Sequence, residues 1–279
     1  MDNTFAYVGS VEVEDMVVAP LVQAGYEHVN AVQDAQVVLT HAINQSLLED
    51  MYFDEQGLIQ QATPGTLLID LSATMPSFAR ELNAVATVSD LAAVEAPFVL
   101  ENVFVSDALT NAENVTILVG GEEDAVEQAT EYLKLIAHRV EVCGGAGSAE
   151  LQKAAYTIQK AASIIAAVET YALFEQAHRS TVSLGGATMT PQTCSQDATY
   201  TMQALGLGGF SSEYTLAMFM GDVAAALETA DDCDLILPQA ESCLHLLELL
   251  MVIGGADMSV AALSLLYADE ETCAEQGLD

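Results

Sequence analysis

The stretch that most constrains the fold runs from Val142 to His178, where a glycine-rich bend is followed by a long helical pattern. The bend, Gly144 to Gly147, contains three glycines in four residues. After it, apolar side chains recur at spacings of three and four residues, which places them on one helical face. They are Leu151, Ala154, Ile158, Ala161, Ile165, Val168 and Ala172. We expect a helix of nearly thirty residues, roughly 43 Å long at ~1.5 Å per residue.

Before the bend, strand patterns alternate with helix patterns. The predicted strands are Thr4–Gly9, Glu27–Val32, Gln36–Thr40, Thr66–Leu71, Val94–Val99, Val115–Val119 and Arg139–Cys143. The predicted helices are Glu12–Gly25, Asn44–Met51, one that begins at Pro76, and Glu123–Ile136. This alternation predicts a largely parallel sheet that is covered by helices on both faces.

After the long helix, the pattern is helical throughout. We predict helices at Thr190–Leu205, Leu216–Ala230, Pro238–Ile253 and Ser259–Ala268. The sequence has no internal repeat and no low-complexity linker, so the glycine-rich bend is the boundary candidate. We therefore expect an α/β domain at 1–145, followed at 146–279 by an interdomain helix and an all-α C-terminal domain.

The charge balance restricts the partners of the chain. Only six Lys and Arg face 41 Asp and Glu, which gives a net charge of −35. Nucleic acid is an unsuitable ligand because binding its phosphates requires clustered basic side chains. No apolar run reaches the ~18 residues of a membrane span, and no positively charged segment precedes an apolar one at the N-terminus. We expect a cytoplasmic protein without a membrane partner.

Neither cysteine nor histidine spacing indicates a metal site. The five cysteines are an odd number without CxxC spacing, and the five histidines are scattered. We expect buried or partly buried thiols, no disulfide framework and no bound metal.

Lys153, Tyr156 and Lys160 are the candidate chemical residues of the long helix, because steps of three, four and seven return to the same helical face. Lys153 could instead be a lysine near the helix start that extends to solvent. Tyr156 and Lys160 also have the Y-x-x-x-K spacing of short-chain dehydrogenases, in which the lysine lowers the pKa of the tyrosine. Chance occurrence of that spacing is the alternative.

Asp70 and Ser72 form a second candidate site, at the carboxyl end of a predicted strand. Ligands of open α/β sheets bind at such ends. The alternative is a strand-to-helix turn in which Ser72 or Thr74 caps the helix that begins at Pro76.

Several motifs of this chain resemble those of the β-hydroxyacid dehydrogenase family, which includes 3-hydroxyisobutyrate and tartronate semialdehyde reductase-type enzymes. The resemblance covers nearly the whole chain. Its segments are Pro64 to Pro76 (PGTLLIDLSATMP), Glu95-Ala96-Pro97, Leu118 to Gly121, Gly144 and Gly147 with Lys153, and Asp257 with Ser259.

The resemblance implies a Rossmann-like N-terminal domain, a long interdomain helix and a helical C-terminal domain that forms a homodimer. It also implies NAD or NADP as cofactor and a small-molecule substrate. Lys153 matches the family's acid/base. On this basis we expect Lys153 and Tyr156 to be catalytic and Ser72 and Lys160 to bind substrate.

The cofactor motif departs from the family's G-x-G-x-x-G. Its positions fall on Gly9, Val11 and Glu14. The second glycine normally lets the backbone approach the pyrophosphate, and the third allows close helix packing. Glu12, Glu14 and Asp15 place carboxylates where a dinucleotide places its phosphates. Normal pyrophosphate docking is therefore not expected.

Other positions differ as well. Asp34 is the candidate ribose-binding residue, but the helix expected between the second and third strands has no counterpart in the sequence. The family's Ser-Gly-Gly after DAP aligns with Val99 to Glu101, and its asparagine after the lysine aligns with Tyr156. The lysine of its Lys-Asp pair aligns with Gly221 before Asp222.

Two hypotheses follow. The first is an NAD(P)-dependent oxidoreductase that acts on a small hydroxy or oxo acid and holds its cofactor in an altered way through Gly9 and Asp34. The second is a non-catalytic or repurposed relative that needs no cofactor, a dimer whose cleft binds another small molecule or a partner protein.

Overall fold

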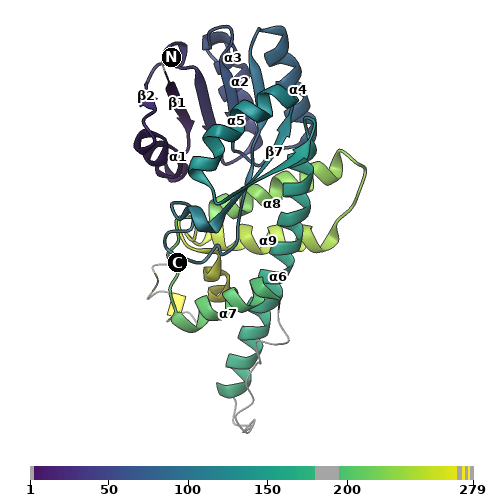
Figure 1. Cartoon of the computed structure of the whole chain (residues 1–279). Helices are drawn as coiled ribbons and strands as arrows, with labels where there is room; N and C mark the ends of the chain where they lie inside the picture. Colours follow the sequence, from purple (N-terminus) through teal and green to yellow (C-terminus); the bar gives the residue numbers. More distant parts are fainter. Residues whose placement is uncertain (1–2, 180–194, 269–271, 274–275, 277–279) are drawn as a thin grey trace.

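The computed structural model describes residues 3–179, 195–268, 272–273 and 276. Figure 1 shows a sheet flanked by helices at one end, and a long helix, α6 (Ser148–Arg179), that leaves this part and runs among the remaining helices. The predicted order of a Rossmann-like α/β part, a long helix and a mostly helical C-terminal part is confirmed. Within the described ranges, no helix is both long and apolar enough to cross a bilayer.

The sheet is mainly parallel, as predicted. Its order is β2-β1-β3-β4-β5-β7-β6, and β8 also pairs with β7. Pairing is parallel from β2 through β5 and between β7 and β8, whereas β5 and β6 run antiparallel to β7. The strands are β1 (Thr4–Gly9), β2 (Glu27–His28), β3 (Val37–His41), β4 (Leu67–Asp70), β5 (Ala92–Glu95), β6 (Phe98–Leu100), β7 (Val115–Gly121) and β8 (Arg139–Gly144).

Alternate strand residues serve the two faces of the sheet. In β3, Val37 and Leu39 pack on one face against α1 (Val11–Gln23) and α5 (Glu123–Ile136). Val38 packs on the other face, among side chains of α2 (Gln45–Phe53), α3 (Leu58–Gln61) and α4 (Pro76–Val88). Because both faces are covered, the strands are apolar along their length rather than alternating between apolar and polar residues.

Two predicted strands are partly wrong. The second ends at His28, because only Glu27 and His28 pair with β1, and the 3₁₀ helix η1 (Val32–Asp34) then leads to β3. The expected absence of a longer helix here is confirmed. The predicted strand Val94–Val99 is interrupted at Ala96-Pro97, since proline has no N–H for the ladder.

The C-terminal elements pack around α6, which has 32 residues. They are α7 (Gln196–Leu207), α8 (Leu216–Asp231), α9 (Pro238–Val252) and the 3₁₀ helix η4 (Val260–Tyr267). The predicted helix at 190–205 begins outside the described residues, and the last predicted helix is 3₁₀ rather than α. Val168, Leu216 and Leu247 belong to the same hydrophobic core as the α1 face of the sheet. The two parts therefore share one core.

A glycine of α8 allows the two parts to meet backbone to backbone. A Cβ atom at Gly221 would lie 2.2 Å from the carbonyl oxygen of Ile43, in the loop after β3. Real Cβ atoms do not approach a carbonyl oxygen this closely. Ser77 of α4 adds a second contact, because its hydroxyl donates to Asp232, just after α8, at 2.5 Å.

We predict that Gly221→Ala lowers the free energy of unfolding by about 1–3 kcal/mol, because the new methyl group forces α8 away from the loop. Gly206→Ala is the matched control, since Gly206 also lies in a helix but has open space at its Cβ position. Alanine should stabilise that position by roughly 0.5–1 kcal/mol. Urea unfolding of both variants measures the difference, and equal effects would contradict the close approach.

Candidate functional site

Polar side chains of α6 bind the outer edge of β6. Strand β6 pairs with β7 along one side only, so the carbonyl groups of its other side need donors. Three α6 residues on one helical face supply them. The donors and acceptors are Lys153 Nζ to Phe98 O at 2.9 Å, Tyr156 Oη to Leu100 O at 2.6 Å and Lys160 Nζ to Glu101 O at 3.2 Å. The predicted grouping of these three residues therefore occurs, and it joins the helix to the sheet.

Lys153 forms a buried ion pair with Asp222 of α8. Its Nζ lies 2.5 Å from Asp222 Oδ2, and Tyr214 donates its hydroxyl to the same oxygen. Lys153 is 5% exposed, so the interpretation as a lysine that extends to solvent is wrong. The Nζ also lies 5.5 Å from the centroid of the Phe98 ring. A carboxylate, a carbonyl and an aromatic face thus hold one ammonium group in place.

Lys160 and Tyr156 make a second polar pair. Lys160 Nζ lies 2.7 Å from Asp197 Oδ1 of α7 and 5.2 Å from the centroid of the Tyr156 ring. Burial lowers the pKa of Lys160, and the bond to Asp197 opposes this shift. Burial raises the pKa of Tyr156, and the carboxylates of Asp197 and Asp222 add to the rise. The short-chain dehydrogenase interpretation requires the opposite shift of the tyrosine pKa, so this arrangement does not favour it.

The space between these side chains is small. A cavity of about 10 Å³ is lined by Phe98, Lys153, Tyr156, Tyr214 and Asp222, among others. That volume holds one water molecule at most. A small acid could reach Lys153 only if α8 or the loop after β6 moves.

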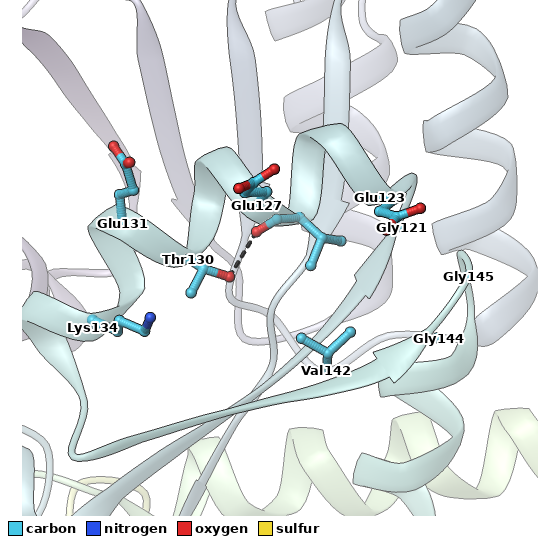
Figure 2. A pocket seen from close by; sticks show the side chains of 10 residues that line it. Gly121, Glu123, Glu127, Thr130, Glu131, Lys134, Val142, Gly144 and Gly145 are labelled. Atoms are coloured by element: carbon cyan, nitrogen blue, oxygen red, sulfur yellow. Dashed lines mark hydrogen bonds between the residues drawn. The ribbon is translucent and has the colours of Figure 1, made fainter.

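A wider hollow of about 830 Å³ lies elsewhere, between α5 and β8 (Figure 2). Figure 2 shows Thr130 and Val142 on its facing walls, with Lys134 toward one end. None of the predicted site residues lines this hollow. It lies away from the Lys153 pair, which is on the β6 side of β7.

Ser72 is part of a buried network around Asp70. Asp70 Oδ1 accepts from the Ser72 hydroxyl at 2.7 Å, from the Ser72 N–H at 3.1 Å and from the Thr40 hydroxyl at 3.1 Å. The Ser72 hydroxyl also accepts a main-chain N–H at 2.9 Å. Burial raises the pKa of Asp70 to about 6, against the effect of these bonds. The capping alternative is wrong, because Met75 is the N-cap of α4 and no side chain caps it; Thr74 donates to Gln45 instead.

The first β-to-α crossover combines a required glycine with an acidic helix start. Gly9 pairs with His41, and a Cβ at Gly9 would lie 2.2 Å from the His41 carbonyl oxygen, so the sheet itself requires this glycine. Helix α1 has Glu12 and Glu14 in its first turn, and the Val11 side chain is 78% exposed. A diphosphate on the amides of this helix would lie beside two carboxylates.

His41 lies between this crossover and Lys153. Its Nδ1 is 2.7 Å from the Ser10 hydroxyl, and its ring centroid is 5.7 Å from that of Phe98. Burial, with a further contribution from the charge of Lys153, lowers the pKa of His41 to about 3. The imidazole is therefore neutral near pH 7.

Asp34 lies apart from these groups. It is exposed at the end of η1, and its main-chain oxygen accepts from Thr4. Asp222 was not among the predicted site residues, although it aligns with the aspartate of the family's Lys-Asp pair. Tyr214, Asp197 and His41 were not predicted either, because no local sequence pattern indicates them.

The cysteines and possible metal ligands are scattered. Cys143, Cys233, Cys243 and Cys273 are free thiols, and Cys194 lies outside the described residues. In the ranges that the structure describes, no three His, Cys, Asp or Glu side chains are placed to hold a metal ion.

Comparison with known proteins relates this geometry to enzymes. Residues 6–145 match the family model of the NAD binding domain of 6-phosphogluconate dehydrogenase. The NAD-dependent L-serine dehydrogenase of Pseudomonas aeruginosa is 30% identical over 171 residues, which are 61% of this chain and 55% of that protein. An uncharacterised Bacillus subtilis oxidoreductase, YkwC, is 28% identical over 201 residues, which are 71% of this chain and 67% of that protein.

A solved structure supports the fold. The 3-hydroxyisobutyrate dehydrogenase of Mycobacterium tuberculosis with L-serine has a TM-score of 0.76 and 22% identity, covering 96% of this chain and 100% of that one. The sequence alignment with a probable 3-hydroxyisobutyrate dehydrogenase of the same species, 30% identical, covers 55% of this chain and only 50% of that protein. The expected family and fold are confirmed.

His41 gives a prediction for the pH dependence of stability. Its pKa is lowered from 6.5 to about 3, so the unfolded chain binds a proton first, and the stability due to neutral His41 is lost as pH falls below 6.5. In the parent chain, this effect lowers the free energy of unfolding by about 1.4 kcal/mol for each pH unit of acidification between pH 6.5 and about 3. We predict that His41→Gln abolishes this part of the pH dependence. Urea unfolding at several pH values measures the slope.

The exposed residue His245 provides the control, because its side chain is 70% exposed and His245→Gln should leave the slope unchanged. Comparison with the parent chain also cancels the contribution of Asp70. That contribution has the opposite sign, since the raised pKa of Asp70 adds stability as pH falls from about 6 toward 3.8. Equal slopes in His41→Gln and the parent chain would contradict a buried neutral imidazole.

Proposed function

The chain belongs to the β-hydroxyacid dehydrogenase family, and from this premise we propose that it is an oxidoreductase of a small hydroxy or oxo acid with Lys153 as its acid/base. The observation that carries the proposal is the buried Lys153–Asp222 pair, at the start of the long helix and between the two parts of the chain. An ammonium held in this way at a domain junction suits proton transfer to a substrate oxygen.

The proposed roles of the side chains follow from their contacts. In reduction, the Lys153 ammonium would donate a proton to the carbonyl oxygen of an oxo acid. In oxidation, the neutral amine would accept the hydroxyl proton. A bound nicotinamide cofactor would supply the hydride to the carbonyl carbon in the first direction and accept it in the second. Asp222 orients the Nζ, and the Tyr214 hydroxyl remains as a donor to Asp222 when Lys153 loses its proton. Tyr156 would orient the substrate oxygen after leaving the Leu100 carbonyl.

Lys160 is the proposed partner of the substrate carboxylate. Its ammonium is bound to Asp197, a carboxylate that an acid substrate could replace. The proposed contact of Ser72 with substrate requires a larger change, because the Ser72 hydroxyl already donates to Asp70 and accepts a main-chain N–H. Ser72 would act only after leaving that network.

The cofactor of this family is NAD or NADP, and the crossover does not fit its diphosphate in the usual way. Each phosphate–carboxylate pair at ~4 Å costs on the order of 4 kcal/mol at an effective dielectric near 20. Glu12 and Glu14 are both in the first turn of α1. We propose that this crossover does not hold a dinucleotide in the family manner, and that only Gly9 and Asp34 remain as candidate contacts.

The second candidate function is that of a non-catalytic or repurposed relative. The cavity of about 10 Å³ beside Lys153 and the acidic helix start both favour it. In this case the side chains of α6 hold the two parts together, and the protein binds a different small molecule or a partner protein. For both candidates we propose a homodimer, supported by exposed Leu173, Leu207 and Val252 on three helices of the C-terminal part.

Calorimetric titration with NAD, NADH, NADP and NADPH distinguishes the two functions. We predict weak binding, with a Kd in the millimolar range, because the carboxylates of α1 repel the diphosphate. No binding at millimolar concentration would contradict the oxidoreductase and favour the non-catalytic relative. The double variant Val11→Gly with Glu14→Gly restores two glycines of the motif and should bind a dinucleotide more tightly than the parent chain. Micromolar binding by the parent chain would contradict the proposed crossover and favour an ordinary dehydrogenase.

For the acid/base role, we predict that Lys153→Ala lowers the kcat of any hydroxy acid oxidation by about 10²–10⁴-fold. Steady-state rates with 3-hydroxyisobutyrate or L-serine as trial substrates measure this, with circular dichroism to verify folding. Lys134→Ala is the matched control, because Lys134 is an exposed lysine far from the pair. An unchanged rate in Lys153→Ala would remove Lys153 from the chemistry.

A further inference from the structure

Glu150 is a buried carboxyl group with one oxygen that has no partner. It lies in the first turn of α6 and is 1% exposed. Its Oε2 accepts the N–H of Thr74 at 3.0 Å. Its Oε1 is buried and has no hydrogen-bond partner among the described residues. An ionised carboxylate in such a position would have to leave water without full compensation.

The groups that face Glu150 make its ionisation still less favourable. Asp70 approaches from β4 and Glu95 from β5, and Lys153 of α6 is the single cation among the groups that act on it in the described chain. The Glu95 carboxylate is already bound, because it accepts the N–H groups of Gly147 and Ala149 at 2.6 and 2.7 Å. It thus caps α6 with negative charge close to Glu150. Burial, followed by the charge of Glu95, raises the pKa of Glu150 well above its ordinary value.

Glu150 is also close to Lys153. Residues three apart on a helix are neighbours on its surface, about 5–6 Å between Cβ atoms. Both side chains are buried, so their charges interact in a medium that screens them weakly. Lys153 already has Asp222 as a partner at 2.5 Å, and it therefore does not need an ionised Glu150 to be stable as an ammonium.

We propose that Glu150 is a positioning residue for Lys153: its buried carboxyl group, with one oxygen that has no partner among the described residues, lies three residues before Lys153 on α6, and a change in its charge acts on the Lys153 ammonium. When Glu150 is neutral, Asp222 is the one carboxylate that balances the Lys153 ammonium, and that ammonium can pass its proton to substrate. An ionised Glu150 adds a second carboxylate and holds the proton on Lys153 more firmly. This assignment rests on the proposed acid/base role of Lys153, but it can be tested without substrate or cofactor.

The test is a pH titration of protein labelled with ¹³C at the lysine ε-carbons, followed by NMR. The chain has three lysines, so three ε-carbon signals are expected, and a Lys153→Arg variant assigns one of them. We expect the Lys153 signal to shift with a step at a pH well above that of an ordinary glutamate, about 4.3. This step should be lost in Glu150→Gln, in which the amide resembles the protonated acid.

Two controls isolate Glu150. Glu127→Gln removes the same charge from an exposed position on α5 and should keep the step. The exposed Lys134 should give the same signal in all variants. A Lys153 signal with the same pH course in Glu150→Gln and the parent chain would overturn the proposal.

A second measurement uses the same variant. The infrared spectrum of the parent chain at a pH below the NMR step should contain a carbonyl stretch of a protonated carboxylic acid that is absent from the spectrum of Glu150→Gln, which separates Glu150 from the other buried carboxyl groups Asp70 and Glu95. A spectrum without that band would also overturn the proposal. The activity of Lys153→Ala tests the acid/base role separately. If the parent chain shows the NMR step but no activity, Glu150 still acts on Lys153, and only the proposed enzymatic function is rejected.

Discussion

The structure depends on the way in which α6 completes the edge of β6. A strand edge exposes carbonyl groups that must find donors, and here Lys153, Tyr156 and Lys160 supply them in place of another strand. The same side chains bind carboxylates of α7 and α8. A single face of one helix therefore joins the sheet to the C-terminal helices, and the site proposed for chemistry is also the joint of the fold.

The interior holds an unusual share of the few cations of this acidic chain. Two of its six basic side chains are buried in pairs with Asp222 and Asp197. Removing either lysine would leave a partly buried carboxylate without its partner, which typically costs several kcal/mol. Meanwhile the surface carries most of the negative charge without neighbouring cations. Association with other molecules should therefore depend strongly on salt.

The elements of the fold follow from local pattern, and the pairings of the site do not. Periodicity predicted α6, and the alternation of elements predicted the sheet, because both depend on neighbours in sequence. The interruption at Pro97 was missed although proline marks it. The role of Ser72 in the Asp70 network and the pair of Lys153 with Asp222, 69 residues apart, depend on how distant segments meet. No spacing rule reports such contacts.

The contact between Gly221 and Ile43 also limits what α8 can carry at the junction of the two parts. Any side chain at position 221 would strike the Ile43 carbonyl oxygen. A larger residue could be accommodated only together with a shift of the loop after β3. Engineering of this face of α8 therefore has to begin with that loop.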